Sequence, residues 1–378
     1  MSDRDEVSRV LFRAKVVRIV RDVLKKIDAE VLYIVTRDLL EYLFPEHLAL
    51  YGVEVTASGA VIYVTPLDFE RASSIYGSVA EVRPVYSGRV GLWMDEELVT
   101  AEDPLKLFET KARGARVATD SRDLATRLVD RARGVSLVRD ELVRLRRSKM
   151  PEELRLIQEA VKRSSRALEM LLQDIRSGIT EAELAARLEH LMRIEGCEDH
   201  AFNTIVAFPP NSSFPHHTAT SKRYDGRSPI LVDFGCRYHG YVSDITRMLV
   251  PSIDTLPQDI ERAIEAVSRA IDASIEVLAP GAKTSEVDGR ARSVLREAGL
   301  AKYFVHSLGH GIGVAVHEQP RLSPFSSVTL IDSDVVTTEP GVYVPRTYGV
   351  RIEEDVAVRR GGADVLTRGI ERVIEFKR

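Results

Sequence analysis

Cysteine, asparagine and glutamine are scarce in this sequence of 378 residues. It contains two cysteines, Cys197 and Cys236, together with two asparagines and four glutamines. Two cysteines are too few for a disulfide framework, and such low usage fits a reducing compartment. The low amide content, beside 29% charged residues, is a bias associated with thermophiles.

Long apolar runs and an excess of one charge are also lacking. No apolar stretch is long enough to span a bilayer, and the charged residues 1–6 do not resemble a signal peptide. The 53 basic and 57 acidic residues nearly balance, for a net charge of −4, which gives no reason to expect binding to nucleic acid or to an anionic membrane. We therefore expect a cytoplasmic protein.

The chain is long enough, and with 44% hydrophobic residues apolar enough, for two domains with buried cores. Residues up to about 140 alternate between helical and strand patterns, which is typical of a small α/β domain. A charged connector then precedes Pro151, where a helix is expected to begin. We predict domains at 1–145 and 146–378. His47 is the single histidine of the first region, and we expect it to have a surface or core role.

The second region contains a duplicated pattern. An amphipathic helix is predicted over 151–176, and Thr180 with Glu183 predicts a capping box for the helix that follows. A second helix pair is predicted after Pro257. The glycines that bound the second helix of each pair, Gly178 and Gly196, then Gly281 and Gly299, are 18 positions apart in both cases. A period of roughly 105 residues suggests two related halves about a pseudo-two-fold axis.

Each half continues into a predicted hairpin that carries two acidic residues. Asp233 and Asp244 flank a turn that we place between Tyr238 and His239, so that the two aspartates face each other. In the second half, a hairpin centred on Arg346 places Glu339 opposite Glu353. Four carboxylates would then converge, and acids in such apolar surroundings should share a proton or bind a cation.

These acids and His310 form a ligand set suited to divalent cations such as Mn(II). Two adjacent ions would activate water beside a polarised carbonyl, which is the chemistry of amide hydrolysis. Glycines on both sides of His310 would let backbone approach the site closely. The alternative is that Asp244 with Arg247, and Glu353 with Arg351, are ordinary ion pairs. The common order of these features in both halves favours the metal site.

At this point the sequence resembles a known family. Residues from about 150 to 375 resemble the pita-bread metallopeptidases, most closely the proline-specific prolidases and Xaa-Pro aminopeptidases. The matching motifs are Phe202–Ala207, Asn211–His217, Asp233–Gly235, Gly240–Arg247, Gly309–Gly313, Val316–Glu318, Thr338–Gly341 and Gly349–Glu353. The resemblance implies an α+β protein in which a smaller creatinase/prolidase-like N-terminal α/β domain precedes a C-terminal pita-bread domain with a pseudo-two-fold repeat.

The resemblance also implies functional roles. It implies a dinuclear site for two divalent ions, Mn or Co, with five ligands: Asp233, Asp244, His310, Glu339 and Glu353. Glu339 would also transfer a proton from water to the leaving nitrogen, and His216 and His317 would contact the substrate. Arg321 would meet a free C-terminal carboxylate. The expected partners are a small peptide with proline after the scissile bond and, by family habit, a second copy of the chain.

Two departures and three alternatives stay open. Phe208-Pro209-Pro210 and Val314-Ala315 differ from the family's usual residues, which suggests an unusual substrate pocket. The leading hypothesis is an Xaa-Pro dipeptidase. The alternatives are an Xaa-Pro aminopeptidase acting on longer peptides, a pita-bread binding module without catalysis, and a creatinase-like carbon–nitrogen hydrolase, which the complete ligand set disfavours.

Overall fold

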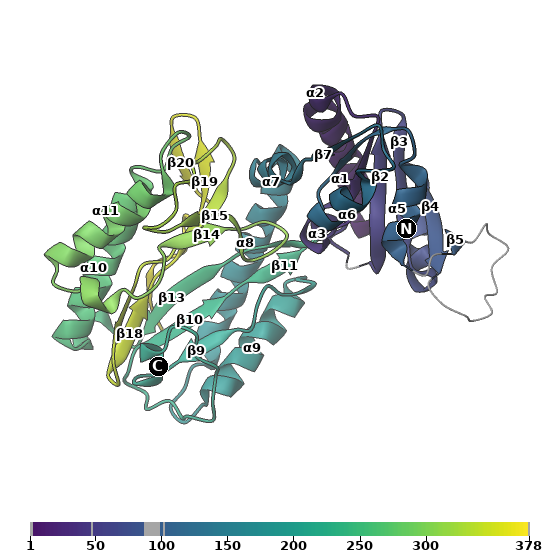
Figure 1. Cartoon of the computed structure of the whole chain (residues 1–378). Coiled ribbons are helices and arrows are strands. Elements are labelled where there is room, and N and C mark those ends of the chain that lie inside the picture. Colours follow the sequence, from purple (N-terminus) through teal and green to yellow (C-terminus); the bar gives the residue numbers. More distant parts are fainter. Residues whose placement is uncertain (1–2, 47, 87–98, 101–102, 377–378) are drawn as a thin grey trace. The chain divides into compact units, whose positions relative to one another are not determined.

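The computed structural model describes residues 3–46, 48–86, 99–100 and 103–376. His47 lies outside the described residues. The chain divides into two compact units, residues 1–146 and 147–378, and each is treated by itself below (Figure 1).

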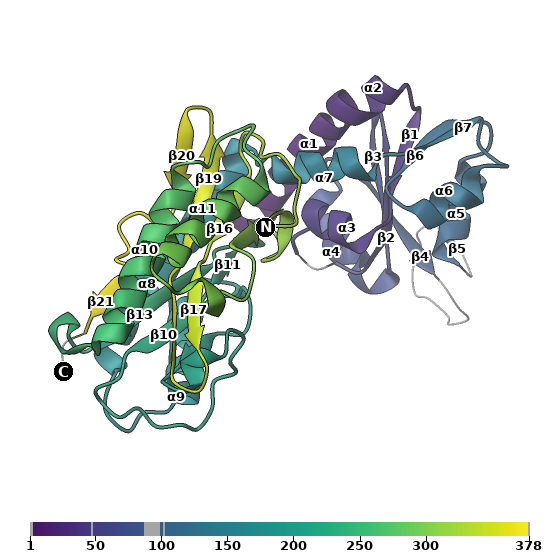
Figure 2. The same cartoon turned by 60° about the vertical axis from the view of Figure 1, so that its left-hand side comes forward.

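The first unit is an α/β domain built on a seven-stranded sheet of order β5-β4-β3-β2-β1-β6-β7. The β1–β2 and β2–β3 pairs are antiparallel, and the other pairs are parallel. Its strands are β1 (Val31–Ile34), β2 (Leu50–Thr56), β3 (Gly59–Val64), β4 (Glu81–Tyr86), β5 (Val99–Thr100), β6 (Arg116–Thr119) and β7 (Gly134–Leu137). Figure 2 shows these strands side by side with helices around them. The predicted α/β domain is confirmed.

The helices of this unit begin with a long one that contains a π-helical turn at Val20–Leu24. They are α1 (Asp3–Ile19), α2 (Lys25–Ile27), α3 (Arg37–Leu43), α4 (Phe69–Tyr76), α5 (Pro104–Lys111), α6 (Arg122–Leu128) and α7 (Arg139–Arg147), whose last residue falls in the second unit. Tyr33, Tyr63 and Phe108 meet in the core, with ring centroids 4.9 and 5.4 Å from Phe108. Aromatic contacts of this kind add to the free energy gained by burial.

Two helix pairs cover the strands of the second unit. The helices are α8 (Pro151–Leu171), α9 (Glu181–Ile194), α10 (Gln258–Ile275) and α11 (Thr284–Glu297). The predicted capping box forms at α9, since the Glu183 amide donates to the Thr180 hydroxyl (3.1 Å) and the Thr180 amide to the Glu183 carboxylate (2.8 Å). The four bounding glycines all have φ between 73° and 98°, a left-handed conformation that other residues rarely adopt.

The strands of the second unit form several small sheets. The orders are β21-β13-β10-β9, β12-β11-β8, β15-β14-β16-β19-β20 and β17-β18. The strands are β8 (Asp199–His200), β9 (Ile205–Ala207), β10 (Ile230–Phe234), β11 (Cys236–Tyr238), β12 (Tyr241–Val242), β13 (Ile245–Val250), β14 (Gly309–Gly311), β15 (Glu318–Leu322), β16 (Val335–Thr338), β17 (Gly341–Val344), β18 (Tyr348–Arg351), β19 (Glu354–Arg359), β20 (Gly362–Val365) and β21 (Val373–Glu375).

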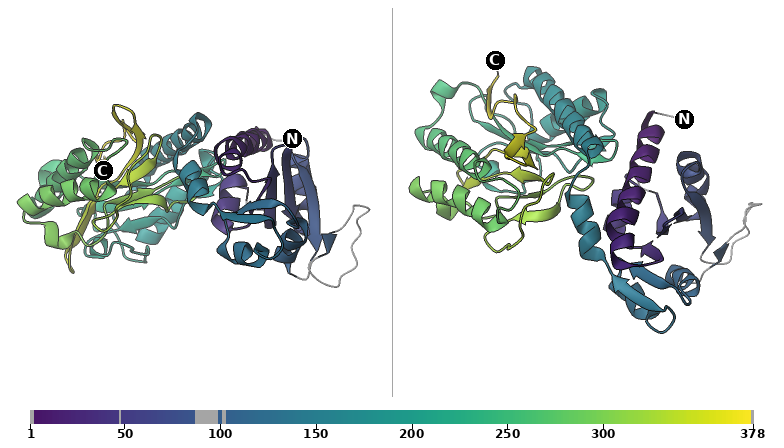
Figure 3. Two further views of the ribbon diagram at one scale, coloured as in Figure 1. Left: turned by 45° about the horizontal axis from the view of Figure 1, so that its top comes forward. Right: turned by 90° about the horizontal axis from the view of Figure 1, so that it is seen from above.

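The two halves of this unit correspond in detail. An isolated bridge joins the N-cap of α9 to a later segment (Thr180 with Arg223), and another joins the N-cap of α11 to its own later segment (Lys283 with Thr329). Figure 3 shows α10 and α11, in green, on the opposite side of the strands from α8 and α9, in teal. Each helix pair packs on its own hydrophobic cluster. The predicted pseudo-two-fold fold is confirmed.

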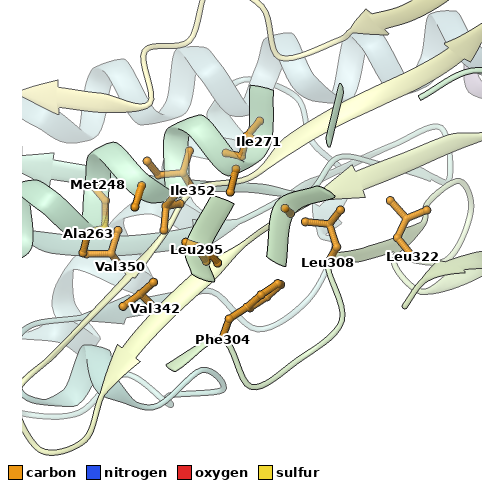
Figure 4. Close-up of a cluster of buried hydrophobic side chains, with 14 of the residues drawn as sticks. Met248, Ala263, Ile271, Leu295, Phe304, Leu308, Leu322, Val342, Val350 and Ile352 are labelled. Atoms are coloured by element: carbon orange, nitrogen blue, oxygen red, sulfur yellow. The ribbon is translucent and has the colours of Figure 1, made fainter. Parts of the chain in front are cut away.

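The cluster under α10 and α11 joins helix residues to the β17–β18 hairpin, which lies between Glu339 and Glu353 in the chain (Figure 4). Ile271 and Leu295 from the helices, and Val342 and Val350 from β17 and β18, are all fully buried. Each such side chain removed from water contributes roughly 1.5–3 kcal/mol to folding. The hairpin is thereby held firmly against the helix pair.

A disulfide joins Cys197, just after α9, to Cys236 at the start of β11. This bond was not expected, because the low cysteine usage had been interpreted as fitting a reducing compartment; the two residues are 39 positions apart. Both are buried in the cluster under α8 and α9. Within the described residues, no helix is long and apolar enough to cross a membrane.

Candidate metal centre

The first acidic hairpin has a different register from the predicted one. Asp233 pairs with Thr246, and Tyr238 pairs with Tyr241, so the turn lies at His239 and Gly240, both of which have positive φ. The predicted pairing of Asp233 with Asp244 is therefore wrong by two residues. Because side chains alternate between faces with a period of two, a shift of two leaves both aspartates on the same face.

The hairpin passes from one sheet to another at Gly235. A Cβ there would lie 2.0 Å from the carbonyl oxygen of Ser243, so only glycine permits this approach. Beyond Gly235, the β11–β12 pair continues in a separate sheet. Asp244 lies between the two parts, where its amide donates to a carboxylate oxygen of Asp355 (3.0 Å).

The second hairpin has the predicted register. Val344 pairs with Tyr348 across a turn centred on Arg346, and Gly341 pairs with Arg351. The adjoining strands β16 and β19 keep the same register, with Thr338 opposite Glu354. Glu339 and Glu353 occupy the facing positions between the two ladders, as predicted.

His310 lies on β14 and brings the two hairpins together. Its Nε2 is 3.2 Å from Oε1 of Glu339 and 3.7 Å from Oδ2 of Asp244. A Cβ on Gly309 would lie 2.1 Å from the Thr337 carbonyl oxygen, and one on Gly311 would lie 2.3 Å from the Gln319 carbonyl oxygen. The predicted need for glycine beside this histidine is confirmed.

The carboxylates form a buried, closely spaced group. Asp233, Asp244 and Glu353 are 8%, 5% and 1% exposed. Burial raises the pKa of Asp244 well above its usual range, and the charges of Glu353 and Asp233 raise it further. Burial and the charges of Glu339 and Asp233 likewise raise the pKa of Glu353. Like charges held this close favour a bound cation or a shared proton.

Glu339 is the exception among the four acids. Burial acts to raise its pKa, but the hydrogen bond and charge of His310, with His306 and Arg351, outweigh burial and lower the pKa to about 2. The side chain of Glu339 is 19% exposed, against 7% for Asp244 and 11% for Asp233. Glu339 is thus the most accessible of these three acids and is ionised at neutral pH.

The donor set fits divalent ions. One ligand atom from each of Asp244, His310 and Glu353 lies within 4.8 Å of the others. Among the described residues, Asp233 Oδ1 and Glu353 Oε1 are buried acceptors without a hydrogen-bond donor. A buried carboxylate oxygen without a partner is costly, and a hard cation would satisfy it.

A buried network behind the acids was not found from the sequence. Arg351 donates to Asp233 Oδ2 (2.5 Å), to the Tyr343 hydroxyl (2.7 Å) and to Thr246 Oγ1 (3.1 Å). Thr246 in turn donates to Glu353 Oε2 (2.8 Å). Arg351 therefore orients acids from both hairpins. The ion pairs weighed at the sequence level, Asp244 with Arg247 and Glu353 with Arg351, are not the ones observed, since Arg247 binds Glu354 instead.

Three histidines lie close to the acids. The ring of His317 is 4.4 Å from the ring of His310. Burial lowers the pKa of His317, and the charges of His310 and His216 lower it further. His306, which the sequence reasoning missed, bonds the Tyr343 hydroxyl through Nε2 (3.0 Å). His306 precedes His310 by four positions, and this spacing could have identified it as a candidate. His216 and His317 are both exposed, and their role as substrate contacts stays a prediction.

The structure also shows the surroundings of Arg321 and of the two segments that differ from the family's usual residues. Arg321 is exposed on β15, directly opposite His310 in register, and its Nε donates to Ser307 Oγ (3.2 Å). Phe208 is buried against Tyr224, with ring centroids 5.1 Å apart. Val314 and Ala315 donate their amides to Glu318, whose carboxylate also pairs with buried Lys149 (3.1 Å). Phe208 is therefore part of the hydrophobic core under α8 and α9.

Comparisons with known proteins agree with this geometry. The family described as "Metallopeptidase family M24" matches residues 155–360. An Xaa-Pro dipeptidase of Pyrococcus furiosus is 38% identical over 231 residues, which are 61% of this chain and 66% of that protein, just under two thirds of its length. The crystal structure of an X-Pro aminopeptidase from Thermotoga maritima superimposes with a TM-score of 0.80 at 26% identity, covering 95% of this chain and 99% of that one. The structure of the Pyrococcus furiosus prolidase gives 0.74 at 27% identity, covering 92% and 99%.

Proposed function

Because this chain belongs to metallopeptidase family M24, we propose that it is a metal-dependent Xaa-Pro dipeptidase, which hydrolyses the peptide bond before proline. The observation that carries the proposal is the convergence of four acids and His310 from both halves of the fold, with buried oxygens that lack a donor among the described residues. Residues 146–378 form the proposed catalytic domain, and residues 1–145 form the N-terminal domain.

The proposed ligands are Asp233, Asp244, His310, Glu339 and Glu353, for two divalent ions of the Mn(II) or Co(II) kind. Two such ions supply Lewis acidity toward the scissile carbonyl and lower the pKa of a water molecule. Arg351 holds Asp233 in place and, through Thr246, also holds Glu353. Residues that orient ligands in this way tune both metal affinity and reactivity.

Glu339 transfers a proton from the attacking water to the leaving nitrogen. Its lowered pKa keeps the carboxylate ionised, so that it can accept the proton that water loses on attacking the carbonyl carbon. The carbon–nitrogen bond then breaks, and Glu339 delivers that proton to the proline nitrogen. The products are a free amino acid and proline. His216 and His317, which are both exposed, hold the substrate through its polar atoms.

The test is a substrate panel on the full-length protein, stripped with chelator and reloaded with Mn(II) or Co(II). We expect hydrolysis of Ala-Pro and Met-Pro, loss of activity on chelation, and about two ions per chain by metal analysis. Glu265→Gln, on the exposed face of α10, is the matched control for acid-to-amide changes at the site. A metal-loaded protein that leaves both dipeptides intact would refute the proposal.

An Xaa-Pro aminopeptidase is the second candidate, because a solved enzyme of that kind superimposes well over nearly the whole chain. Comparing Ala-Pro with Ala-Pro-Ala separates the two activities. A dipeptidase prefers the shorter peptide, whose free carboxylate Arg321 would bind. A protein that binds metal but cleaves neither peptide would be a binding module.

The proposed homodimer is tested by sedimentation of the same preparation.

A further inference from the structure

One buried carboxylate organises the segment that carries His216. Glu181 is the first residue of α9 and is 0% exposed. It accepts hydrogen bonds from the Phe208 amide (2.9 Å), Asn211 Nδ2 (3.1 Å to each oxygen), His217 Nε2 (2.9 Å), the Thr220 amide (3.1 Å) and the Thr220 hydroxyl (2.6 Å). Residues 208–220, here called the His216 segment, are therefore fixed at four points by one side chain.

The other side of the His216 segment lies against the second hairpin. Ser212 Oγ accepts a hydrogen bond from the Gly349 amide (2.9 Å), and the Pro215 carbonyl accepts one from Arg351 Nη1 (3.1 Å). Arg351 is the same residue that binds Asp233. The segment thus spans from the N-terminus of α9 to the acid-bearing hairpin, and His216 is left exposed between its anchors.

The fold itself does not require a carboxylate at this position. The corresponding first residue of α11 is Thr284, whose hydroxyl binds Ser326 Oγ (2.8 Å) and the Val328 carbonyl (3.0 Å). A threonine therefore suffices to tie a helix of this kind to its returning segment. The half with the carboxylate is the half that carries His216.

The bonds to Glu181 depend on its charge. Burial acts to raise the pKa of Glu181, but the hydrogen bonds from Thr220, Phe208, His217 and Asn211 outweigh burial, and the net pKa is lowered. These four partners all donate to the carboxylate. A glutamine would keep the shape but replace one acceptor oxygen with a donor group, which would face other donors.

We propose that Glu181 is a positioning residue for the reaction, which holds the His216 segment so that His216 meets the substrate. Glu181 acts through residues 208–220, and His217 is one of its anchors. This inference rests on the proposed peptidase function, because His216 is taken as a substrate contact.

The test compares Glu181→Gln with Glu183→Gln in the full-length, metal-loaded protein. Both acids lie in the first turn of α9, but Glu183 bonds to Thr180 at the helix start and Glu181 bonds to the His216 segment. Both changes therefore weaken the helix start, and only Glu181→Gln loosens the segment. We expect Glu181→Gln to lower kcat/KM for Ala-Pro about tenfold or more at unchanged metal content. Glu183→Gln should stay within about twofold of wild type.

A double-variant cycle tests whether Glu181 acts through His216. If it does, adding Glu181→Gln to His216→Ala should cause little further loss, because the residue being positioned is already gone. Fully multiplicative losses, or equal activity of the Glu181→Gln and Glu183→Gln proteins, would overturn the inference. If Glu181→Gln does not fold, Thr220→Val removes one donor and should show a smaller loss of the same kind.

Hydrogen exchange gives a result that does not depend on activity. The Phe208 and Thr220 amides donate to Glu181 and should exchange faster in Glu181→Gln, with no change in α10 or α11. If the wild type cleaves no Xaa-Pro peptide, the proposed function fails, and faster exchange still shows that Glu181 holds the segment. Unchanged exchange at both amides would overturn the inference by itself.

Discussion

Arg351 Nη2 donates a hydrogen bond to Asp233 Oδ2 over 2.5 Å, while Asp233 Oδ1 has no donor among the described residues. The two oxygens of one carboxylate thus have different surroundings. One is held by a buried guanidinium, and the other is available to a cation. This division orients Asp233 before any ion arrives, which reduces the cost of assembling the metal centre.

Replacing Arg351 should therefore damage the centre without removing a ligand. We expect Arg351→Met to lower Mn(II) affinity or kcat by about 10- to 100-fold, the usual effect of losing a partner that orients a ligand. Arg351→Lys should restore little, because an ammonium cannot reproduce the forked contacts to Asp233, Tyr343 and Thr246. Arg359→Met, which removes a contact to Ser333, is the control. Equal metal affinity and turnover in both Met variants would contradict this role.

Glu339→Gln should abolish proton transfer while leaving the fold intact. We expect activity to fall by roughly 100-fold or more, because a proton-transfer group that is also a ligand is lost. Metal analysis separates the two losses, since a variant that keeps its ions and still fails to turn over has lost the proton carrier. Unchanged turnover would refute the role assigned to Glu339, and Glu265→Gln should behave as wild type.

Metal binding should release protons. The pKa values of Asp244, Glu353 and His310 are raised in the metal-free protein, and each group must be deprotonated to bind a metal. Near pH 6.5 we therefore expect Mn(II) binding to release roughly one proton or more, measured by calorimetry in buffers with different ionisation heats. Affinity should weaken as pH falls. Affinity that weakens only as pH rises would contradict the scheme.

The stability of the metal-free protein should depend on pH in the opposite direction and fall as pH rises. An acid whose pKa is raised by folding contributes stability that is present below its ordinary pKa and is lost as pH rises through its folded value. Burial raises the pKa of Asp355 to about 8, and those of Asp244 and Glu353 are raised as well. The Tm of the metal-free protein should fall from about pH 5 to about pH 8. The metal-loaded protein should lack this decline, because its ligands stay ionised.

Local patterns in the sequence were sufficient to predict the helices and strands of the second unit and the register of one of the two acid-bearing hairpins. The second hairpin was placed correctly because Arg346 is the single central residue of its turn, and Glu339 and Glu353 followed from counting. The first was misplaced because His239 and Gly240 both adopt positive φ, which moves the turn centre by one residue. Because the register error is two residues, Asp233 and Asp244 stay on the predicted face of the hairpin, and the acids still converge.

The groups that hold the site in place could not be read from the sequence. Arg351 bonds directly to Asp233 and Thr246, and it shares the Tyr343 hydroxyl with His306. Glu181 bonds to residues 208–220, which lie 27 or more positions away. These contacts depend on how separate elements pack. Proximity along the chain favoured Arg351 with Glu353, whereas the folded chain pairs Arg351 with Asp233. Periodicity predicts which face is buried, but it does not say which polar group meets which across that face.

The disulfide between Cys197 and Cys236 should stabilise the second unit. Closing a loop of 39 residues contributes about 4 kcal/mol in the chain-entropy account, or about 10 °C in Tm for a domain of this size. Mass spectrometry without reductant should show the pair, and reductant should lower the Tm of the wild type. The double variant Cys197→Ser with Cys236→Ser should have the lower Tm already and should not respond to reductant. Free thiols in the native protein would disprove the pairing.

Arg321 should decide how long a substrate the protein prefers. Its exposed guanidinium lies across from His310 on β15, where it can meet the carboxylate of a dipeptide. We expect Arg321→Met to raise KM for Ala-Pro about tenfold or more and to leave kcat/KM for Ala-Pro-Ala nearly unchanged, because the carboxylate of the tripeptide lies one residue further away. Arg296→Met, exposed on α11, is the matched control. Equal losses on both peptides would show that Arg321 supports the fold of the site instead of reading the peptide end.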